Sequence, residues 1–141
     1  MKRSASAVWK GGLTNGTGTV STESGVLSGT PYNFKMRFEE EKGTNPEELV
    51  AAAHAACFSM ALSLFLGNAG MTAESIETKA TVTLEKIGEG FSVTSSHLDT
   101  SVRIPNADRA AFAQAAEGAK TGCPISKLLA AATITMTARV V

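Results

Sequence analysis

Two cysteines are the first candidates for chemistry in this sequence, and they stand in different local contexts. Cys123 precedes Pro124 at an expected helix start, where backbone N–H groups and the helix macrodipole stabilise a thiolate. Cys57 lies in the middle of a long apolar stretch, where burial raises the pKa of a thiol and leaves it an inert core residue. Cys57 therefore needs a nearby cation if it is to react.

Few side chains are candidates for activating Cys57. His54 lies one helical turn before it, and a Cys/His pair is typical of a thiol hydrolase, although no third orienting residue is evident. A zinc site from His54, Cys57, His97 and Cys123 has suitable residue types but no zinc-motif spacing. Arg37 is the stronger candidate, because it lies opposite an apolar stripe on an expected strand, just before the loop into the helix that carries Cys57. An exposed strand arginine is the simpler alternative.

Composition narrows the classes of partner and compartment. The chain has 141 residues, 43% of them hydrophobic, which suits one domain with a core, residues 1–141. Its thirteen basic and thirteen acidic residues cancel, so neither nucleic acid nor an anionic membrane is an expected partner. The opening MKRSASAVWKGG lacks the apolar region of a secretory signal. We therefore expect a cytoplasmic protein whose two cysteines have thiol chemistry rather than a structural disulfide.

The element that must position Cys57 is a long helix within residues 43–70. Asn45 can cap it, Pro46 suits the first helical position, and Glu47 with Glu48 complements the macrodipole. Gly67, Asn68 and Gly70 are typical of a helix end. The sequence thus predicts a helix of about 21 residues, roughly 31 Å long, from Pro46.

This helix is apolar on all sides, so it must be buried on all sides, in lipid or in protein. Its many alanines make it weakly hydrophobic for a bilayer span and allow other backbones to approach closely, which favours protein. One small sheet covers only one side. We therefore expect a second copy of the chain to cover the other side, in a homodimer whose central helices meet.

The other expected elements surround this helix. In order they are strands at 5–9 and 18–22, a strand at 32–38, the central helix, strands at 76–84 and 91–104, a helix at 109–120, a short helix after 122–124 and a strand at 134–140. The strand at 91–104 is the more polar and is expected near a sheet edge, and Leu128 and Leu129 are expected to face inward. This order indicates an α+β fold.

Three segments carry a resemblance to a known family. TVSTESGVL at 19–27, RFEEEKGTNPEELVAAAHAACFSMALS at 37–63 and KTGCPISKLL at 120–129 closely resemble the OsmC branch of the OsmC/Ohr family of organic hydroperoxide peroxidases. The likeness covers nearly the whole chain and both cysteine contexts. It implies antiparallel sheets wrapped around a long central helix in an intertwined homodimer, with the active sites at the subunit interface.

The resemblance also implies roles for four residues. Cys57 matches the peroxidatic cysteine, Cys123 the resolving cysteine, Arg37 the arginine that activates the thiolate and Glu47 the glutamate that pairs with it. No metal or cofactor is implied; the reductant is a dithiol of the lipoyl type. The expected reaction converts an organic hydroperoxide to an alcohol through a Cys57 sulfenic acid and a Cys57–Cys123 disulfide, in defence against oxidative or osmotic stress.

Helix geometry adds one constraint to these roles. Glu47 and Cys57 are ten positions apart on one helix, hence ~15 Å along its axis, so we expect Glu47 to serve the cysteine of the partner subunit. Two other classes stay open: a hydrolase or acyl transferase using Cys57 with His54, and a non-catalytic binding module. Which thiol attacks is also open, since helix-terminus physics favours Cys123 and the family pattern favours Cys57.

Overall fold

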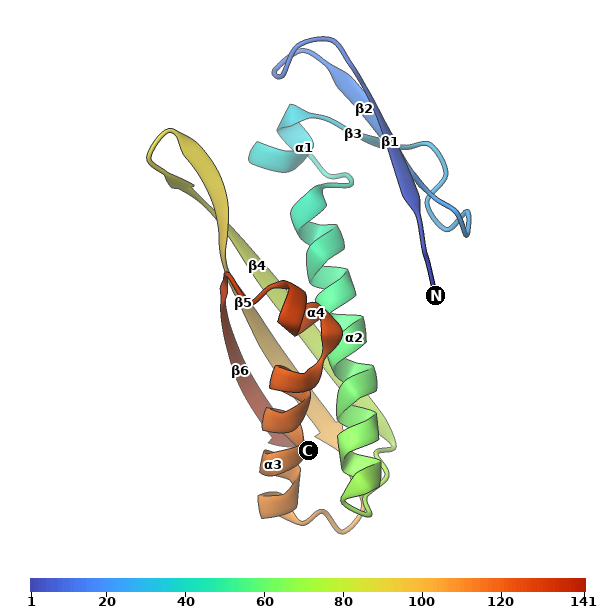
Figure 1. Cartoon of the computed structure of the whole chain (residues 1–141), viewed down its shortest axis with the longest axis vertical. Helices are drawn as coiled ribbons and strands as arrows, with labels where there is room; N and C mark the ends of the chain where they lie inside the picture. Colours follow the sequence, from blue (N-terminus) through green and yellow to red (C-terminus); the bar gives the residue numbers. More distant parts are fainter. The chain divides into compact units, whose positions relative to one another are not determined.

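A computed structural model describes all residues, 1–141, in two compact units, Met1–Leu49 and Val50–Val141. The long helix α2 begins in the first unit and continues through the second. The elements in chain order are β1 (Ala5–Lys10), β2 (Thr17–Thr22), β3 (Thr30–Tyr32), α1 (Phe34–Phe38), α2 (Pro46–Asn68), β4 (Ser75–Ile87), β5 (Gly90–Arg103), α3 (Arg109–Gly122), α4 (Pro124–Leu128) and β6 (Thr133–Val140) (Figure 1). The α+β class expected from the sequence is confirmed.

The first unit is built on a small antiparallel sheet in the order β1-β2-β3. Gly18 of β2 pairs with Trp9 on one side and Tyr32 on the other. The rings of Trp9 and Tyr32 pack together, with centroids 5.4 Å apart. A Cβ at position 18 would lie 2.5 Å from a Tyr32 ring carbon and 2.7 Å from a Trp9 ring carbon, so only glycine lets the two rings close over the strand.

The strand expected at 32–38 is wrong beyond Tyr32, because residues Phe34–Phe38 form the one-turn helix α1. The Asn33 side chain caps this helix and accepts a hydrogen bond from the Met36 N–H at 2.8 Å. Phe34 and Phe38, four positions apart, then pack ring against ring with centroids 4.9 Å apart. Local capping by asparagine therefore overrides the alternating pattern. Arg37 lies on this helix and not on a strand.

Helix α2 begins at Pro46, as the sequence predicts. Asn45 Oδ1 accepts a hydrogen bond from the Glu48 N–H at 2.8 Å, which satisfies a free donor of the first turn. At the other end Gly70 has φ 74°, and the Met71 N–H donates to the Leu66 carbonyl. A polar side-chain cap at the start and a left-handed glycine at the end thus set the helix length.

Helix α2 has one buried stripe and one exposed apolar face in the single chain. The buried stripe is His54, Phe58, Leu62 and Leu66. On the other face Met60 is 76% exposed and Leu64 63% exposed. By length and composition alone, with a mean hydropathy of 2.0, α2 meets the requirements of a membrane span, as buried core helices also do. The face that carries Met60 and Leu64 needs a further cover.

The second unit contains a three-stranded sheet in the order β4-β5-β6. β4 and β5 form an antiparallel hairpin, whereas β6 pairs with β5 in parallel, so this sheet is not purely antiparallel. The expected edge position of β5 is wrong, because β5 is the central strand. Its polar character comes partly from Ser96 and Thr100, which are fully buried and form hydrogen bonds. From the sequence alone, a serine or threonine that is buried and hydrogen-bonded cannot be told from one that is exposed to solvent.

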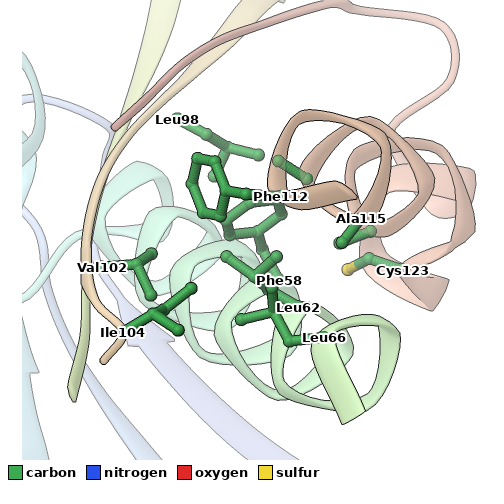
Figure 2. Packing of buried hydrophobic residues seen from close by; sticks show 11 residues of the cluster. Phe58, Leu62, Leu66, Leu98, Val102, Ile104, Phe112, Ala115 and Cys123 are labelled. Carbon is green, nitrogen blue, oxygen red and sulfur yellow. The ribbon is translucent and has the colours of Figure 1, made fainter. Parts of the chain in front are cut away.

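Helices α2 and α3 lie side by side along one face of this sheet (Figure 1). The core between these three elements contains Phe58, Leu62 and Leu66 of α2, Leu98 and Val102 of β5 with Ile104 just beyond it, and Phe112 and Ala115 of α3 (Figure 2). Cys123 packs at the edge of the same cluster. The hydrophobic core of the second unit therefore includes Cys123.

The helices before and after Cys123 begin where the sequence predicts. Asp108 caps α3, accepting hydrogen bonds from the Ala110 and Ala111 N–H groups, each at 3.0 Å. Helix α4 starts at Pro124. The expectation that Leu128 faces inward is wrong, since it is 76% exposed, whereas Ser126 is buried. The Ser126 hydroxyl is hydrogen-bonded to the buried His54 of α2, which explains why the serine faces inward and Leu128 faces outward.

Candidate active site

The structure brings the two cysteines together. Cys57 lies half-buried on α2, while Cys123 is fully buried, at the end of α3 and the start of α4. Their Sγ atoms share a hydrogen bond at 2.8 Å, and both are free thiols. The two sulfur atoms are thus in direct contact without a covalent bond, and only a small movement separates them from disulfide distance, ~2.05 Å.

The surroundings of Cys57 act on its pKa in opposite directions. Burial is the largest effect and raises the pKa of Cys57, and the adjacent Cys123 raises it further. A hydrogen bond from the backbone N–H of Ile125, in the first turn of α4, lowers it. The net pKa lies above the ordinary value of a thiol. Within its unit Cys57 is therefore held as a thiol, and a thiolate needs a positive charge in addition.

The start of helix α4 acts on a different cysteine from the one expected. The sequence assigns the benefit of this helix start to Cys123, the residue that precedes Pro124. In the structure the amide of the first turn bonds the sulfur of Cys57, on the neighbouring helix. The hydrogen bond that lowers the pKa of Cys57 thus comes from the start of α4, and not from α2, in whose middle Cys57 lies.

Arg37 and Glu47 form a second pair, within the first unit. Arg37 Nη2 donates to Glu47 Oε1 at 2.9 Å, and Arg37 Nε lies 3.3 Å from each carboxylate oxygen. The guanidinium carbon also lies 5.1 Å from the centroid of the Phe38 ring. A two-donor contact of this kind orients the guanidinium more firmly than a single bond does.

An aromatic cavity of about 250 Å³ adjoins Arg37. Six other residues line it: Trp9, Leu13, Tyr32, Asn33, Phe34 and Phe38. Most of these side chains are apolar, and the guanidinium of Arg37 is the only charged group that lines the cavity. The cavity can therefore hold an apolar group beside a cation.

His54 is fully buried, and both of its ring nitrogens are bonded to serines. Nδ1 lies 2.7 Å from Ser96 Oγ on β5, and Nε2 lies 2.9 Å from Ser126 Oγ on α4. Burial lowers the pKa of His54 from 6.5, so the ring is neutral at physiological pH. Because neither nitrogen is free to take a proton from Cys57, this geometry does not support the hydrolase alternative, and it does not support His54 as a zinc ligand.

Sequence reasoning missed both serines. Ser96 belongs to a strand that the sequence predicts near a sheet edge, where a serine hydroxyl is expected to be hydrated by solvent. Ser126 lies three positions after Cys123, as Cys57 lies three positions after His54. That matching i, i+3 spacing was the available signal, since such residues share a helix face.

Two free thiols in contact, on an α+β scaffold with one long helix, are an arrangement typical of proteins with thiol redox chemistry. Residues 39–138 match the family model described as OsmC-like protein. The chain is 56% identical over 125 residues to Peroxiredoxin OsmC of Escherichia coli (strain K12), covering 89% of this chain and 87% of the relative. Peroxiredoxin OsmC of Shigella flexneri matches to the same extent. The chain belongs to the OsmC family.

Solved structures agree with this assignment. The organic hydroperoxide resistance protein OhrB of Bacillus subtilis is 25% identical, covers 96% of this chain and 98% of its own, and has a TM-score of 0.71. The OsmC-like protein VCA0330 of Vibrio cholerae, 18% identical with a TM-score of 0.77 and 99% coverage of both chains, shows the same fold. The prediction of a cysteine-based peroxidase in the OsmC family is confirmed.

Proposed function

We propose that this peroxidase reduces organic hydroperoxides to alcohols through a Cys57 sulfenic acid and a Cys57–Cys123 disulfide. The observation that supports it most is the 2.8 Å contact between the two thiols. A sulfenic acid formed at Cys57 has a thiol partner already in place. Cys57 is the attacking residue because it is the less buried of the two and accepts the Ile125 N–H.

The reaction has three steps. The Cys57 thiolate attacks the distal oxygen of ROOH, the O–O bond breaks, and a proton completes the alcohol ROH while Cys57 becomes sulfenic acid. The Cys123 thiol condenses with the sulfenic acid, forming the S–S bond and releasing water. A dithiol of the lipoyl type then reduces the disulfide by two thiol exchanges and is itself oxidised to a disulfide.

Arg37 supplies the positive charge that Cys57 lacks within its own unit. It holds the thiolate and hydrogen-bonds the peroxide, and Glu47 orients it through the two-donor contact. Because Glu47 and Cys57 are ten helical positions apart, ~15 Å, Glu47 serves the cysteine of the partner subunit. Arg37 is bonded to the Glu47 of its own chain, so it comes from the partner together with that glutamate.

The dimer that this arrangement requires uses the exposed face of α2. Met60 and Leu64 of one chain pack against the same face of the other, in a two-fold interface. This contact gives the apolar helix a protein cover in place of lipid. We accordingly propose a cytoplasmic homodimer without nucleic-acid or membrane partners, acting in defence against oxidative or osmotic stress.

The aromatic cavity beside Arg37 favours an organic hydroperoxide over hydrogen peroxide. An apolar R group buried among Trp9, Tyr32 and Phe34 contributes roughly 25 cal/mol for each Å² of apolar surface removed from water. Hydrogen peroxide has no such group. Only the hydroperoxide end then needs the guanidinium of Arg37.

A thiol count tests the proposed function. The reduced protein is titrated with an organic hydroperoxide under anaerobic conditions, and free thiols are measured before and after a dithiol is added. We expect both thiols per chain to be lost and both to return. Cys57→Ser abolishes turnover, whereas Cys123→Ser completes one stoichiometric round and then overoxidises. Full steady-state activity in Cys57→Ser would overturn the scheme.

Mixed dimers test the origin of Arg37 and Glu47. A Glu47→Ala chain and a Cys57→Ser chain are each inactive alone. After unfolding and refolding together, the heterodimer contains one site with an intact Cys57 from one chain and an intact Arg37–Glu47 pair from the other. We expect part of the activity to return. If no mixing ratio restores it, the donation across the interface is refuted.

A further inference from the structure

Two contacts join the same pair of helices at the thiol site. One is the contact between Cys57 and Cys123, with Sγ atoms 2.8 Å apart. The other is the hydrogen bond between His54 Nε2 and Ser126 Oγ, at 2.9 Å. In each contact one residue belongs to α2 and the other to the segment formed by Cys123 and α4. The spacing matches as well, three positions on each side, so the two contacts are adjacent.

Helix α4 is held to the rest of its unit mainly by Ile125, which packs against the core, and by Ser126, which is bonded to His54. It is only five residues long, and Ser126 is its only buried residue. Its last residue, Leu128, is 76% exposed. The Ser126 hydroxyl is bonded to His54, which is itself held from the other side by Ser96 of the central strand β5. The bond from Ser126 to His54 is thus the side-chain hydrogen bond that ties α4 to α2.

We propose that His54 is a positioning residue for the disulfide step. Through Ser126 it holds α4 so that the Cys123 thiol and the Ile125 N–H both face Cys57. A neutral imidazole suits this task, because one ring nitrogen donates and the other accepts, and a serine hydroxyl complements either. This inference rests on the proposed function, since it concerns the fate of the Cys57 sulfenic acid.

The proposal concerns a competition between two reactions of Cys57 sulfenic acid. Condensation with the Cys123 thiol forms the S–S bond and releases water. A second ROOH instead transfers an oxygen atom, which yields the sulfinic acid and ROH. Only the first reaction needs α4 in place. Loosening α4 therefore lowers the ratio of disulfide to sulfinic acid, whatever the rate of the first oxidation.

Ser126→Ala tests this inference, with Ser96→Ala as the matched control. Each variant removes one buried hydroxyl and leaves one His54 nitrogen without its partner, but only Ser126→Ala disconnects α4. The hydroperoxide concentration that converts half of Cys57 to sulfinic acid is measured by mass spectrometry, with dithiol recycling. We expect Ser126→Ala to lower it about tenfold, equivalent to ~1.4 kcal/mol, the size of one buried hydrogen bond. Melting temperatures show whether the two variants lose similar stability.

His54→Asn breaks the same bond from the other side, because its shorter side chain does not reach Ser126, and it is expected to shift the ratio in the same direction. An unchanged ratio in both Ser126→Ala and His54→Asn overturns the inference. An equal shift in Ser96→Ala also overturns it, since the effect would then reflect lost stability. The proposed function fails separately, if the unmodified protein forms no Cys57–Cys123 disulfide with hydroperoxide.

Discussion

The buried His54 makes the stability of the protein depend on pH. Burial lowers the pKa of His54 from 6.5, the value expected in the unfolded chain. Below that pH the imidazole of residue 54 therefore binds a proton in the unfolded state but not yet in the native state. The free energy of unfolding is thus highest above pH 6.5, and it falls as the pH drops from there toward the lower pKa of the folded state.

The size of this effect is set by linkage. Between the two pKa values the unfolded state holds one extra proton, so stability falls by up to ~1.4 kcal/mol per pH unit. Protonation also turns both ring nitrogens into donors, and the hydroxyls of Ser96 and Ser126 must then both accept. No carboxylate is bonded to the ring to offset the buried charge.

The assay is urea unfolding of the reduced protein at about pH 7.5 and about pH 5.5, at one protein concentration, for the unmodified chain and for His54→Gln. Glutamine keeps a polar amide at the site but does not titrate. We expect the unmodified chain to lose up to ~1.4 kcal/mol more than the variant between the two conditions. The two proteins differ only at position 54, so the difference between their losses reports on His54 alone. An equal loss in both would refute the reasoning.

Three further predictions concern the core, a cap and the site. Leu62→Ala should cost ~3–5 kcal/mol in chemical unfolding, because Leu62 is fully buried, while Leu128→Ala, at a residue that is 76% exposed, should change stability by less than ~0.5 kcal/mol. Asp108→Ala should lower the free energy of unfolding by ~1 kcal/mol, because it removes the two hydrogen bonds that cap α3. Asp108→Asn keeps a capping oxygen and should retain most of that stability. Arg37→Lys loses the two-donor contact and should slow the reaction of Cys57 with hydroperoxide by about tenfold near neutral pH, measured as thiol loss, with less slowing near pH 9.

The sequence predicts the elements whose ends have local chemical signals. Asn45 and Pro46 mark the start of α2, and Asp108 marks the start of α3, because a cap acts within a single turn. The α+β order and the hairpin of β4 and β5 are predictable from alternation and a glycine turn. These signals do not depend on distant residues, so one sequence is enough to read them.

Elements that depend on distant partners were not predictable in the same way. The short helix after Tyr32 is a different case, because its cap Asn33 is local, but the apolar alternation of the same residues favours a strand. The central place of β5 depends on β6 pairing in parallel from the end of the chain. The bonds of His54 join α2 to β5 and α4, which are distant in the sequence, and the matching i, i+3 spacing indicates only the bond to Ser126. The four proposed site residues and their two pairings come from the resemblance, and the structure places Cys57 beside Cys123 and Arg37 beside Glu47.

In the proposed mechanism the two observed pairs, Cys57 with Cys123 and Arg37 with Glu47, have different roles. The unit that holds Cys57 and Cys123 raises the pKa of Cys57 through burial, and the Ile125 N–H offsets only part of that. A free chain with such a cysteine is protected from unspecific oxidation, because the thiol, not the thiolate, predominates. The proposed partner subunit brings Arg37, already oriented by Glu47, and with it the charge that shifts the balance. In the proposed dimer reactivity requires assembly, so we expect the α2 face that carries Met60 and Leu64 to control the chemistry as well as the stability of that dimer.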